Sequence, residues 1–279
     1  MKDWLNVANK SLKVMDFKEV NLDILRRYFL KETYRIENFR SMYKKCLSAL
    51  LILRFFTQKF YCTIYFLVKE PSVFIYQIQL RFHGGLSGGY QFVRLLELKK
   101  IIKQNKPNTV MEFGSGASSL LFAKYSTLVS LEESPYWLEK YKYHLNRNKL
   151  IPRQLKIKLN NSLFLVPRVE KCVAGEVVAT YESVFDWKSQ EFDLVYVDGP
   201  TNWLQNDSLN CKVKDPLESL PCFGTLELSK KPKIIVVDGR PATVAFIIKS
   251  GIYDDYNITL KGVYELKPKI NPYHTIFKL

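Results

Sequence analysis

Four acidic residues carry the chemistry that this sequence suggests, because each stands at or near the end of a short apolar run. They are Glu112, Glu132, Asp198 and Asp238. Short apolar runs are typical of buried parallel strands, whose carboxyl ends meet along one edge of a sheet. Ligands bind in the crevice outside that edge, so the four carboxylates are expected to line a site there. In a chain with a net charge of +15, four acids at one edge favour a cationic ligand over a phosphate.

A glycine turn follows the run that holds Glu112. Gly114 and Gly116 allow the backbone to turn sharply and let a ligand approach without a Cβ in the way. The helix expected after the turn would direct its free N–H groups into the crevice. A dinucleotide-binding fingerprint has a third glycine three residues after the second, where this sequence has Ser119, and this argues against NAD.

The stretch of residues 112–116 resembles motif I of the class I S-adenosylmethionine-dependent methyltransferases, in which an acid stands two residues before a G-x-G turn. Glu132 lies 18 residues beyond Gly114, close to the offset of ~20 residues at which a carboxylate reaches ribose hydroxyls in nucleotide-binding βαβ units. A solvated acid at a strand end is the alternative for Glu132. Ser134 and Pro135 then provide an N-cap and a first turn for the next helix.

Two later stretches repeat the order strand, acid, glycine. Residues 192–200 end in Val-Asp-Gly-Pro and resemble the fourth strand of the same family, in a form frequent in a subgroup linked to polysaccharide and cell-surface biosynthesis. Residues 233–241 repeat the arrangement as a fifth strand. The resemblance covers about residues 84–279. It implies an α/β fold, with a Rossmann-like seven-stranded, mostly parallel sheet, helices on both of its faces and a final antiparallel pair of strands.

The resemblance also implies S-adenosyl-L-methionine as the cofactor. Glu112 would serve its methionine end and Glu132 its ribose, while Asp198 is assigned to both the cofactor and the acceptor. The loop residues implied in cofactor binding are Gly114, Ser115, Gly116, Ser118 and Ser119. The implied reaction is a methyl transfer, and O-methylation of a glycan or small-molecule acceptor is the expected form.

A hydroxyl acceptor needs a base, and the candidates are Asp198, Asp238 and His83. The two aspartates end adjacent strands of the family's sheet, so they are expected to face one another and to share a proton, hold a cation or bracket a substrate donor. Catechol-type O-methyltransferases hold a divalent ion there with an Asn after the second acid, where this sequence has Gly239. A metal-free mechanism is therefore favoured, with a divalent ion held by oxygen ligands as the alternative.

Three further polar residues lie near these motifs. Arg240 is expected to pair either with an acidic acceptor or with a neighbouring acid. His144 and His274 fall on a predicted helix and a predicted strand, where a structural role is expected.

The elements that would position these residues can be placed along the chain. A helix is expected at residues 91–103, and the third strand at residues 155–159, where apolar and cationic residues alternate. Residues 176–181 could form a small extra strand, and residues 201–232 a lid or substrate wall. Two final strands are expected within residues 257–279.

A glycine-rich stretch separates the site from the N-terminal part of the chain. Residues 83–89 contain four glycines, a composition typical of a flexible connection, and the domain boundary is placed there. Residues 1–83 would form an N-terminal helical extension, and residues 84–279 the methyltransferase domain.

The extension contains a long apolar run at residues 47–68. Arg54 and Lys59 oppose a membrane-spanning helix, so a buried helix or a peripheral membrane contact is expected instead. Residues 1–81 hold 15 basic and 7 acidic residues, a difference of +8, which suits an anionic membrane surface.

Composition leaves several partners and functions open. The positive charge is compatible with nucleic acid, anionic lipid, an acidic substrate or a simple lysine-rich bias. The alternative functions are a non-catalytic scaffold with a methyltransferase fold and an RNA methyltransferase. Residues 198–201 read Asp-Gly-Pro-Thr in place of the Asn/Asp-Pro-Pro-Tyr motif of amino-group methyltransferases, which disfavours nucleic acid.

The five cysteines show no C-x-x-C spacing, so neither a zinc site nor a disulfide framework is expected. Free thiols favour a reducing compartment. A cytoplasmic location is therefore expected, with membrane association as an additional feature.

Overall fold

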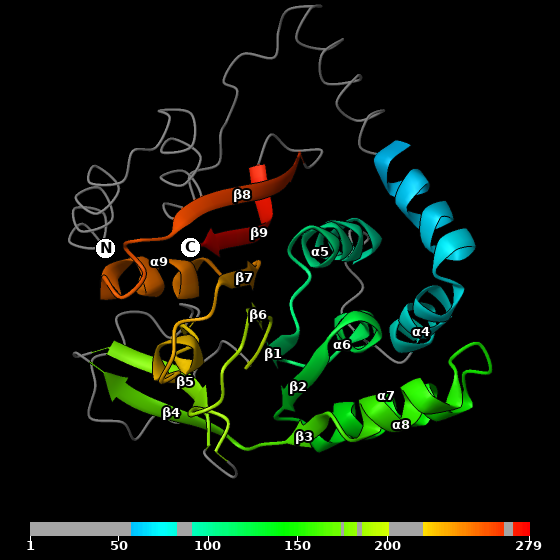
Figure 1. Ribbon diagram of the computed structural model, residues 1–279, viewed down its shortest axis with the longest axis horizontal. Coiled ribbons are helices and arrows are strands. Elements are labelled where there is room, and N and C mark those ends of the chain that lie inside the picture. The colour runs from blue at the N-terminus through cyan, green and yellow to red at the C-terminus, as the bar shows by residue number, and fades with distance from the viewer. Residues whose placement is uncertain (1–56, 83–90, 174–175, 183–185, 201–219, 265–269) are drawn as a thin grey trace, which may run out of the picture.

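The computed structural model describes residues 57–82, 91–173, 176–182, 186–200, 220–264 and 270–279 (Figure 1). The expectations for His83, for the glycine-rich stretch and for residues 201–219 of the expected lid fall outside these ranges. The first described element is a helix over residues 57–69.

A seven-stranded sheet forms the centre of the fold, with the strand order β3-β2-β1-β6-β7-β9-β8. Neighbouring strands from β3 to β7 in this order are parallel, while β9 is antiparallel to β7 and β8. The strands are β1 (Thr109–Phe113), β2 (Thr127–Glu132), β3 (Leu163–Leu165), β6 (Leu194–Val197), β7 (Ile234–Asp238), β8 (Asn257–Tyr264) and β9 (Ile270–Lys278). This confirms the expected Rossmann-like sheet with its final antiparallel pair.

A second, two-stranded antiparallel sheet stands apart from the main one. It consists of β4 (Arg168–Val173) and β5 (Glu176–Tyr181). The small extra strand expected at residues 176–181 is thereby confirmed. Its position in the chain, between β3 and β6, makes it an insertion into the parallel sheet's strand order.

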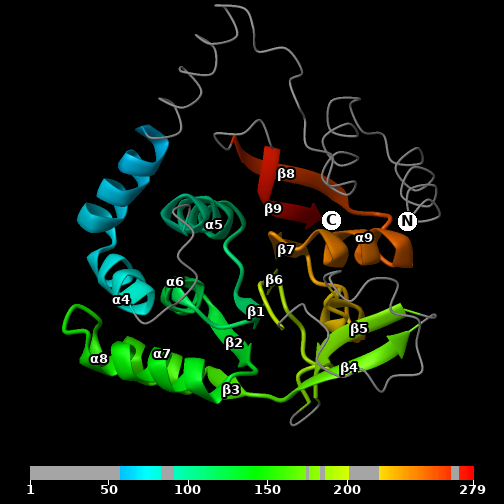
Figure 2. The same cartoon turned by 180° about the vertical axis from the view of Figure 1, so that it is seen from behind.

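Helices cover both faces of the main sheet, as expected (Figures 1 and 2). They are α4 (Pro71–Phe82), α5 (Gln91–Asn105), α6 (Ala117–Tyr125), α7 (Pro135–Arg147), α8 (Arg153–Asn160) and α9 (Pro241–Ser250), with a short 3-10 helix, η1 (Gly224–Glu227). Successive strand residues point to opposite faces. Val110 therefore packs in the core that contains side chains of α4 to α8, whereas Met111 packs in the core that contains those of α9.

The third strand expected at residues 155–159 is wrong, because these residues lie in α8. Leu155 and Leu159 both pack against the core, whereas Ile157 is 52% exposed. Residues four apart share a helix face, so a short alternation of apolar residues and lysines fits a helix as well as a strand. The third strand is instead the short β3, parallel to β2.

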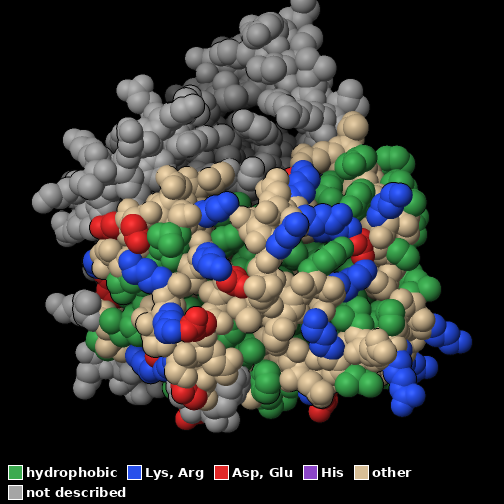
Figure 3. Space-filling view, in the orientation of Figure 1, with side chains coloured by type: hydrophobic (Ala, Val, Ile, Leu, Met, Phe, Trp, Pro, Cys, Tyr) green, Lys and Arg blue, Asp and Glu red, His purple; other side chains and the backbone are tan. Residues whose placement is uncertain are grey.

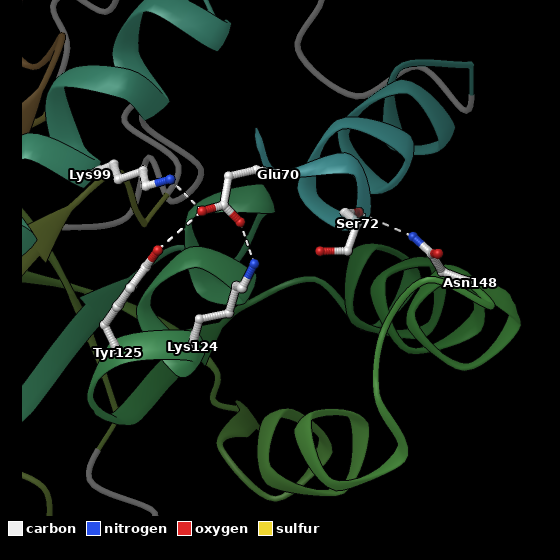
Figure 4. Close-up of polar contacts among 6 residues, drawn as sticks. All are labelled: Glu70, Ser72, Lys99, Lys124, Tyr125 and Asn148. Carbon is white, nitrogen blue, oxygen red and sulfur yellow. Dashed lines mark hydrogen bonds and ion pairs between the residues drawn. The ribbon is translucent and has the colours of Figure 1, made fainter. Parts of the chain in front are cut away.

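The described N-terminal helices pack on the domain through buried polar contacts (Figure 4). Glu70, between the helix of residues 57–69 and α4, accepts hydrogen bonds from three side chains of α5 and α6, namely Lys99, Lys124 and Tyr125. Asn148, after α7, donates from Nδ2 to the backbone carbonyl of Ser72 at 3.1 Å. The domain boundary expected near residue 84 stays a prediction, but α4 is packed as part of the domain.

Among the three cysteines in the described part of the chain, one departs from expectation. Cys62 and Cys222 are buried free thiols, whereas Cys172 of β4 is disulfide-bonded. The expectation of free thiols is therefore wrong for Cys172, because sequence spacing alone does not reveal which cysteines come together in the fold.

Candidate functional site

A cavity of about 980 Å³ opens at the carboxyl edge of the parallel strands. Its wall contains residues that follow β1, β2, β6 and β7, together with residues of α4, α5, α7 and β4. The candidate residues in the wall are Gly114, Ser115, Gly116, Ser118, Glu132, Asp198 and Asp238. The cavity therefore lies where ligands bind in open α/β sheets, and it unites three of the four predicted acids.

Glu112 is fully buried beneath the glycine loop and does not belong to the cavity wall. Its Oε1 accepts a hydrogen bond from Ser118 Oγ at 2.5 Å, and its Oε2 accepts from Ser119 Oγ at 2.5 Å and from Ser130 Oγ at 2.6 Å. Burial raises the pKa of Glu112 to about 7, and the three hydroxyl donors oppose this rise. Glu112 thus ties the first turn of α6 to β1 and β2, and shapes the loop from behind.

Glu132 joins the loop to the start of α7. Its Oε2 accepts from the backbone N–H of Ser115 at 3.2 Å, and its Oε1 accepts from the backbone N–H of Ser134 at 3.0 Å. Burial raises the pKa of Glu132 to about 7, against the effect of these two donors. A carboxylate has further acceptor positions, so Glu132 can also accept a hydrogen bond from a ligand hydroxyl in the cavity.

Two glycines touch where the chain leaves β1 and β6. A Cβ added to Gly114 would lie 2.7 Å from the backbone nitrogen of Gly199, and Gly114 has a φ of +91° that disfavours other residues. A Cβ added to Gly199 would lie 2.3 Å from Tyr181 Oη and 2.7 Å from the backbone nitrogen of Gly114. The glycine of the Val-Asp-Gly-Pro turn is therefore required by a close backbone approach to the first loop.

The change Gly199→Ala is expected to lower the free energy of unfolding by about 1–3 kcal/mol, because the new methyl group must displace backbone atoms. Gly116→Ala is the matched control, since an added Cβ there meets nothing closer than Ser118 Oγ at 3.7 Å and the backbone is extended. Gly116→Ala should lower the free energy of unfolding by less than ~1 kcal/mol. Urea denaturation measures both, and equal midpoints for the two variants would contradict the close approach.

Asp198 and Asp238 lie side by side in the cavity wall, because they follow the paired strand residues Val197 and Val237. Burial and the charge of Asp238 together raise the pKa of Asp198 to about 8, against the opposing effect of the Arg240 guanidinium. Within the described part of the chain, no hydrogen bond to the Asp198 carboxylate is present. Asp198 is therefore the acid of the pair that is open to a ligand.

Asp238, in contrast, is engaged by its neighbours. Tyr196 Oη donates to its Oδ2 at 2.8 Å, and Arg94 Nη1 lies 3.3 Å from Oδ2 and 3.2 Å from Oδ1. His274 Nε2 is 3.9 Å from Oδ1, and burial lowers the pKa of this histidine. No sequence motif marks Arg94 or Tyr196 as a partner of Asp238, because Arg94 lies on α5 outside the motifs and Tyr196 lies in the middle of β6.

Arg240 has a role that the sequence did not suggest. Its Nη1 donates to the carbonyl oxygen of Pro200 at 2.6 Å, and its Nη2 donates to that of Asp198. Arg240 thus braces the turn after β6 through backbone oxygens, and its expected pairing with an acidic acceptor or a neighbouring acid stays a prediction. This contact holds Asp198 in position from the side of α9.

The rest of the wall comes from elements that sequence motifs did not assign to the site. Gln77 and Leu80 of α4 and Trp137 and Tyr141 of α7 line the cavity. The rings of Trp137 and Tyr141 stack, with centroids 6.1 Å apart, and Tyr76 Oη of α4 donates to the carbonyl oxygen of Tyr141 at 3.2 Å. Apolar periodicity predicts that such helices pack, but it does not distinguish a cavity wall from a solid core.

The structure bears on the predictions made for the histidines and for a metal site. His144 and His274 are buried on α7 and β9, the helix and the strand expected for them. The third base candidate, His83, lies outside the described residues. Among the residues that the structure describes, no group of three or more His, Cys, Asp and Glu side chains is placed to hold a metal ion.

No protein-family model matches the sequence, and no curated protein matches it either. Among solved structures, the chain is similar to an O-methyltransferase from Bacillus cereus in complex with SAH, with a TM-score of 0.47 and 11% identity over 77% of this chain and 96% of that chain. It is also similar to the O-methyltransferase TomG from Streptomyces achromogenes in complex with SAM, with a TM-score of 0.45 and 11% identity over 74% and 89% of the two chains. At these identities the function has to be inferred from the residues of the site itself.

Proposed function

We propose that this chain is an S-adenosylmethionine-dependent methyltransferase. The observation that supports it most is the placement of Glu132 and the loop of residues 114–118 in one cavity with Asp198, at the carboxyl edge of a sheet with this strand order. The loop leaves backbone N–H groups at the start of α6, and Glu132 has acceptor positions left for hydroxyls. Acidic groups in the wall suit a cofactor that carries a sulfonium and an ammonium group.

Each part of the site has a role in this proposal. Glu132 accepts hydrogen bonds from the ribose hydroxyls, and the loop of residues 114–118 holds the methionine end. Glu112 and Ser119 act from behind the loop, because the Glu112 carboxylate fixes the serines that open α6. The stacked rings of Trp137 and Tyr141 offer an apolar wall beside Glu132.

The acceptor in this proposal is a hydroxyl group of a glycan or a small molecule. S-adenosylmethionine, when bound, supplies a methyl group on a positively charged sulfur. Asp198 accepts the proton of the acceptor hydroxyl, while Arg94 and Tyr196 hold Asp238 beside it. The main task of the chain is to position the acceptor, and we propose that this needs no divalent metal. Full turnover in the presence of a chelator is the expected result. Loss of turnover in the chelator, followed by its recovery when magnesium is added, would contradict the metal-free mechanism.

We also propose a peripheral membrane contact through residues 1–83 and a cytoplasmic location, which the free thiols of Cys62 and Cys222 favour and the disulfide at Cys172 opposes. The basic N-terminal part of the sequence supports that contact.

The change Glu132→Ala is expected to weaken binding of S-adenosylmethionine and S-adenosylhomocysteine by roughly ten- to a hundredfold, the effect of losing a charged hydrogen-bond acceptor. Isothermal titration calorimetry on the full chain measures it. Glu139→Ala is the matched control, since it removes the same charge from an exposed position of α7 outside the cavity wall. Unchanged affinity in Glu132→Ala, or preferential binding of NAD by the parent chain, would refute the proposal.

A further inference from the structure

The helix of residues 57–69 is apolar on two opposite sides. Its inner side buries Cys62 and Phe66, and the ring of Phe66 lies 5.6 Å from that of Phe92 on α5. Its outer side exposes large apolar side chains, with exposed fractions of 41% to 69%, at Phe60, Tyr61, Ile64, Leu67 and Val68. Spacings of three, four and seven residues place these five on one helix face, here called the outer stripe.

The contacts of the inner side fix the orientation of the helix and keep the outer stripe exposed to solvent. Lys99 of α5 lies over the ring of Tyr65 at 5.0 Å and pairs with Glu70, which directly follows the helix. Glu70 also pairs with Lys124 of α6 (Figure 4). Turning the helix to bury the outer stripe would separate these buried ion pairs, which is costly. The exposure of the stripe is therefore set by the fold.

The charge near the outer stripe is positive. The helix itself, residues 57–69, contains Lys59 and Lys69 and no Asp or Glu. Residues 135–160, which span α7, α8 and the turn between them, contain seven Lys or Arg and a single Glu, and they expose Tyr143 and Leu150. Figures 1 and 2 place the helix of residues 57–69 and the turn between α7 and α8 on the same side of the molecule. Figure 3 shows hydrophobic and basic side chains together on that side.

We propose that the outer stripe is a contact for an anionic lipid surface, with the helix of residues 57–69 lying in the plane of the interface. An apolar helix face together with nearby basic residues is the pattern of interfacial helices. A second copy of this chain would bring the same positive charge to the contact, which disfavours a symmetric dimer there. Over the described residues, no helix combines the length and the apolar character needed to cross a bilayer.

This contact would place the cavity close to the lipid surface. Helix α4 begins directly after Glu70, and it supplies Gln77 and Leu80 to the cavity wall. The lipid contact and the cavity wall therefore belong to two consecutive helices that are fixed to the same domain. Lipid binding does not depend on methyl transfer, so the two proposals can fail separately.

Sedimentation of the full chain with vesicles tests the contact. The parent is expected to bind vesicles of equal parts phosphatidylcholine and phosphatidylserine more tightly than vesicles of phosphatidylcholine alone. The double change Ile64→Ser and Val68→Ser should weaken binding to the mixed vesicles by about tenfold or more, because two exposed apolar side chains no longer enter the interface. Lys69→Gln should weaken it by about fivefold, the contribution of a basic residue near such a surface.

The matched control is the double change Leu165→Ser and Ile252→Ser, which alters exposed apolar residues away from the outer stripe and should leave vesicle binding unchanged. Circular dichroism melting shows whether each variant is folded, and the exposed stripe positions should tolerate serine. Absence of parent binding to mixed vesicles, or equal binding of the Ile64 and Val68 variant, would overturn the proposal. A stripe variant that changes the oligomeric state by light scattering but not vesicle binding would also overturn it, and would assign the stripe to self-association.

Discussion

The change Asp198→Asn is expected to lower methyl transfer by about 10²–10⁴-fold, the range typical for loss of a general base. Asparagine keeps the size of the side chain but cannot accept the proton of an acceptor hydroxyl. The loop of residues 114–118 and Glu132 are untouched, so cofactor affinity should stay within a fewfold of the parent. Turnover is measured with labelled S-adenosylmethionine and the best acceptor found in a screen, and affinity by calorimetry.

The pH profile distinguishes a base from a merely structural residue. Burial and the charge of Asp238 raise the pKa of Asp198 to about 8. The carboxylate form is the active one, so turnover of the parent should rise with pH and level off above about 8. A bound sulfonium would favour the carboxylate and move this rise to lower pH. The residual activity of Asp198→Asn should lack the rise altogether.

Asp254→Asn is the matched control, because it removes a carboxylate at an exposed position remote from the cavity wall. It should leave both turnover and the pH profile unchanged. Parent-like turnover in Asp198→Asn would remove Asp198 from the mechanism. A loss of turnover that is matched by an equal loss of cofactor affinity would instead assign Asp198 to cofactor binding.

The strands and the loop of this site could be predicted because their signals are local. The Gly114 turn and the acids at the ends of β2, β6 and β7 each lie within a few residues of an apolar run. The surroundings of Glu112 were less predictable, because three serine hydroxyls donate to its buried carboxylate. Ser118 and Ser119 are near it in sequence, but Ser130 arrives from β2, and only the folded sheet brings it there.

The parts that sequence reasoning missed depend on contacts between distant segments. Arg94 reaches Asp238 across 144 residues of chain, and no motif marks it. Gln77 of α4 joins the cavity wall although the glycine-rich stretch suggested that everything before it is separate. Helix α8 was missed for a different reason, since five alternating residues do not decide between a period of 2.0 and one of 3.6.

The change Glu70→Ala is expected to lower the free energy of unfolding by about 3–5 kcal/mol, the usual cost of removing one partner from a buried ion pair. Glu70 is 4% exposed, and its carboxylate is shared by Lys99, Lys124 and Tyr125 (Figure 4). Lys99 is also 4% exposed, so its charge would be left buried without this carboxylate. Because Glu70 lies between the helix of residues 57–69 and α4, the loss should loosen both helices first.

The pH dependence of stability gives a second measure of this cluster. Burial would raise the pKa of Glu70, but the hydrogen bonds from Lys124 and Lys99 outweigh it and hold the pKa below its ordinary value of 4.5. A carboxyl group with a lowered folded-state pKa contributes stability that is complete above its unfolded-state pKa and is lost as the pH falls through the folded-state pKa. The parent should therefore lose stability between about pH 5 and the lowered pKa more steeply than Glu70→Ala does.

Urea denaturation at neutral pH and at pH values below 4.5 measures both effects. Glu191→Ala is the matched control, since Glu191 pairs with Lys230 at the surface, with both side chains more than 60% exposed. Such an exposed pair contributes about 0–1 kcal/mol to the free energy of unfolding, so the urea midpoint of Glu191→Ala should stay close to that of the parent. Equal effects of the two variants at neutral pH would show that Glu70 does not fix the N-terminal helices to the domain. Selective proteolysis before residue 91 in Glu70→Ala, with the sheet still protected, would show that these helices detach before the rest unfolds.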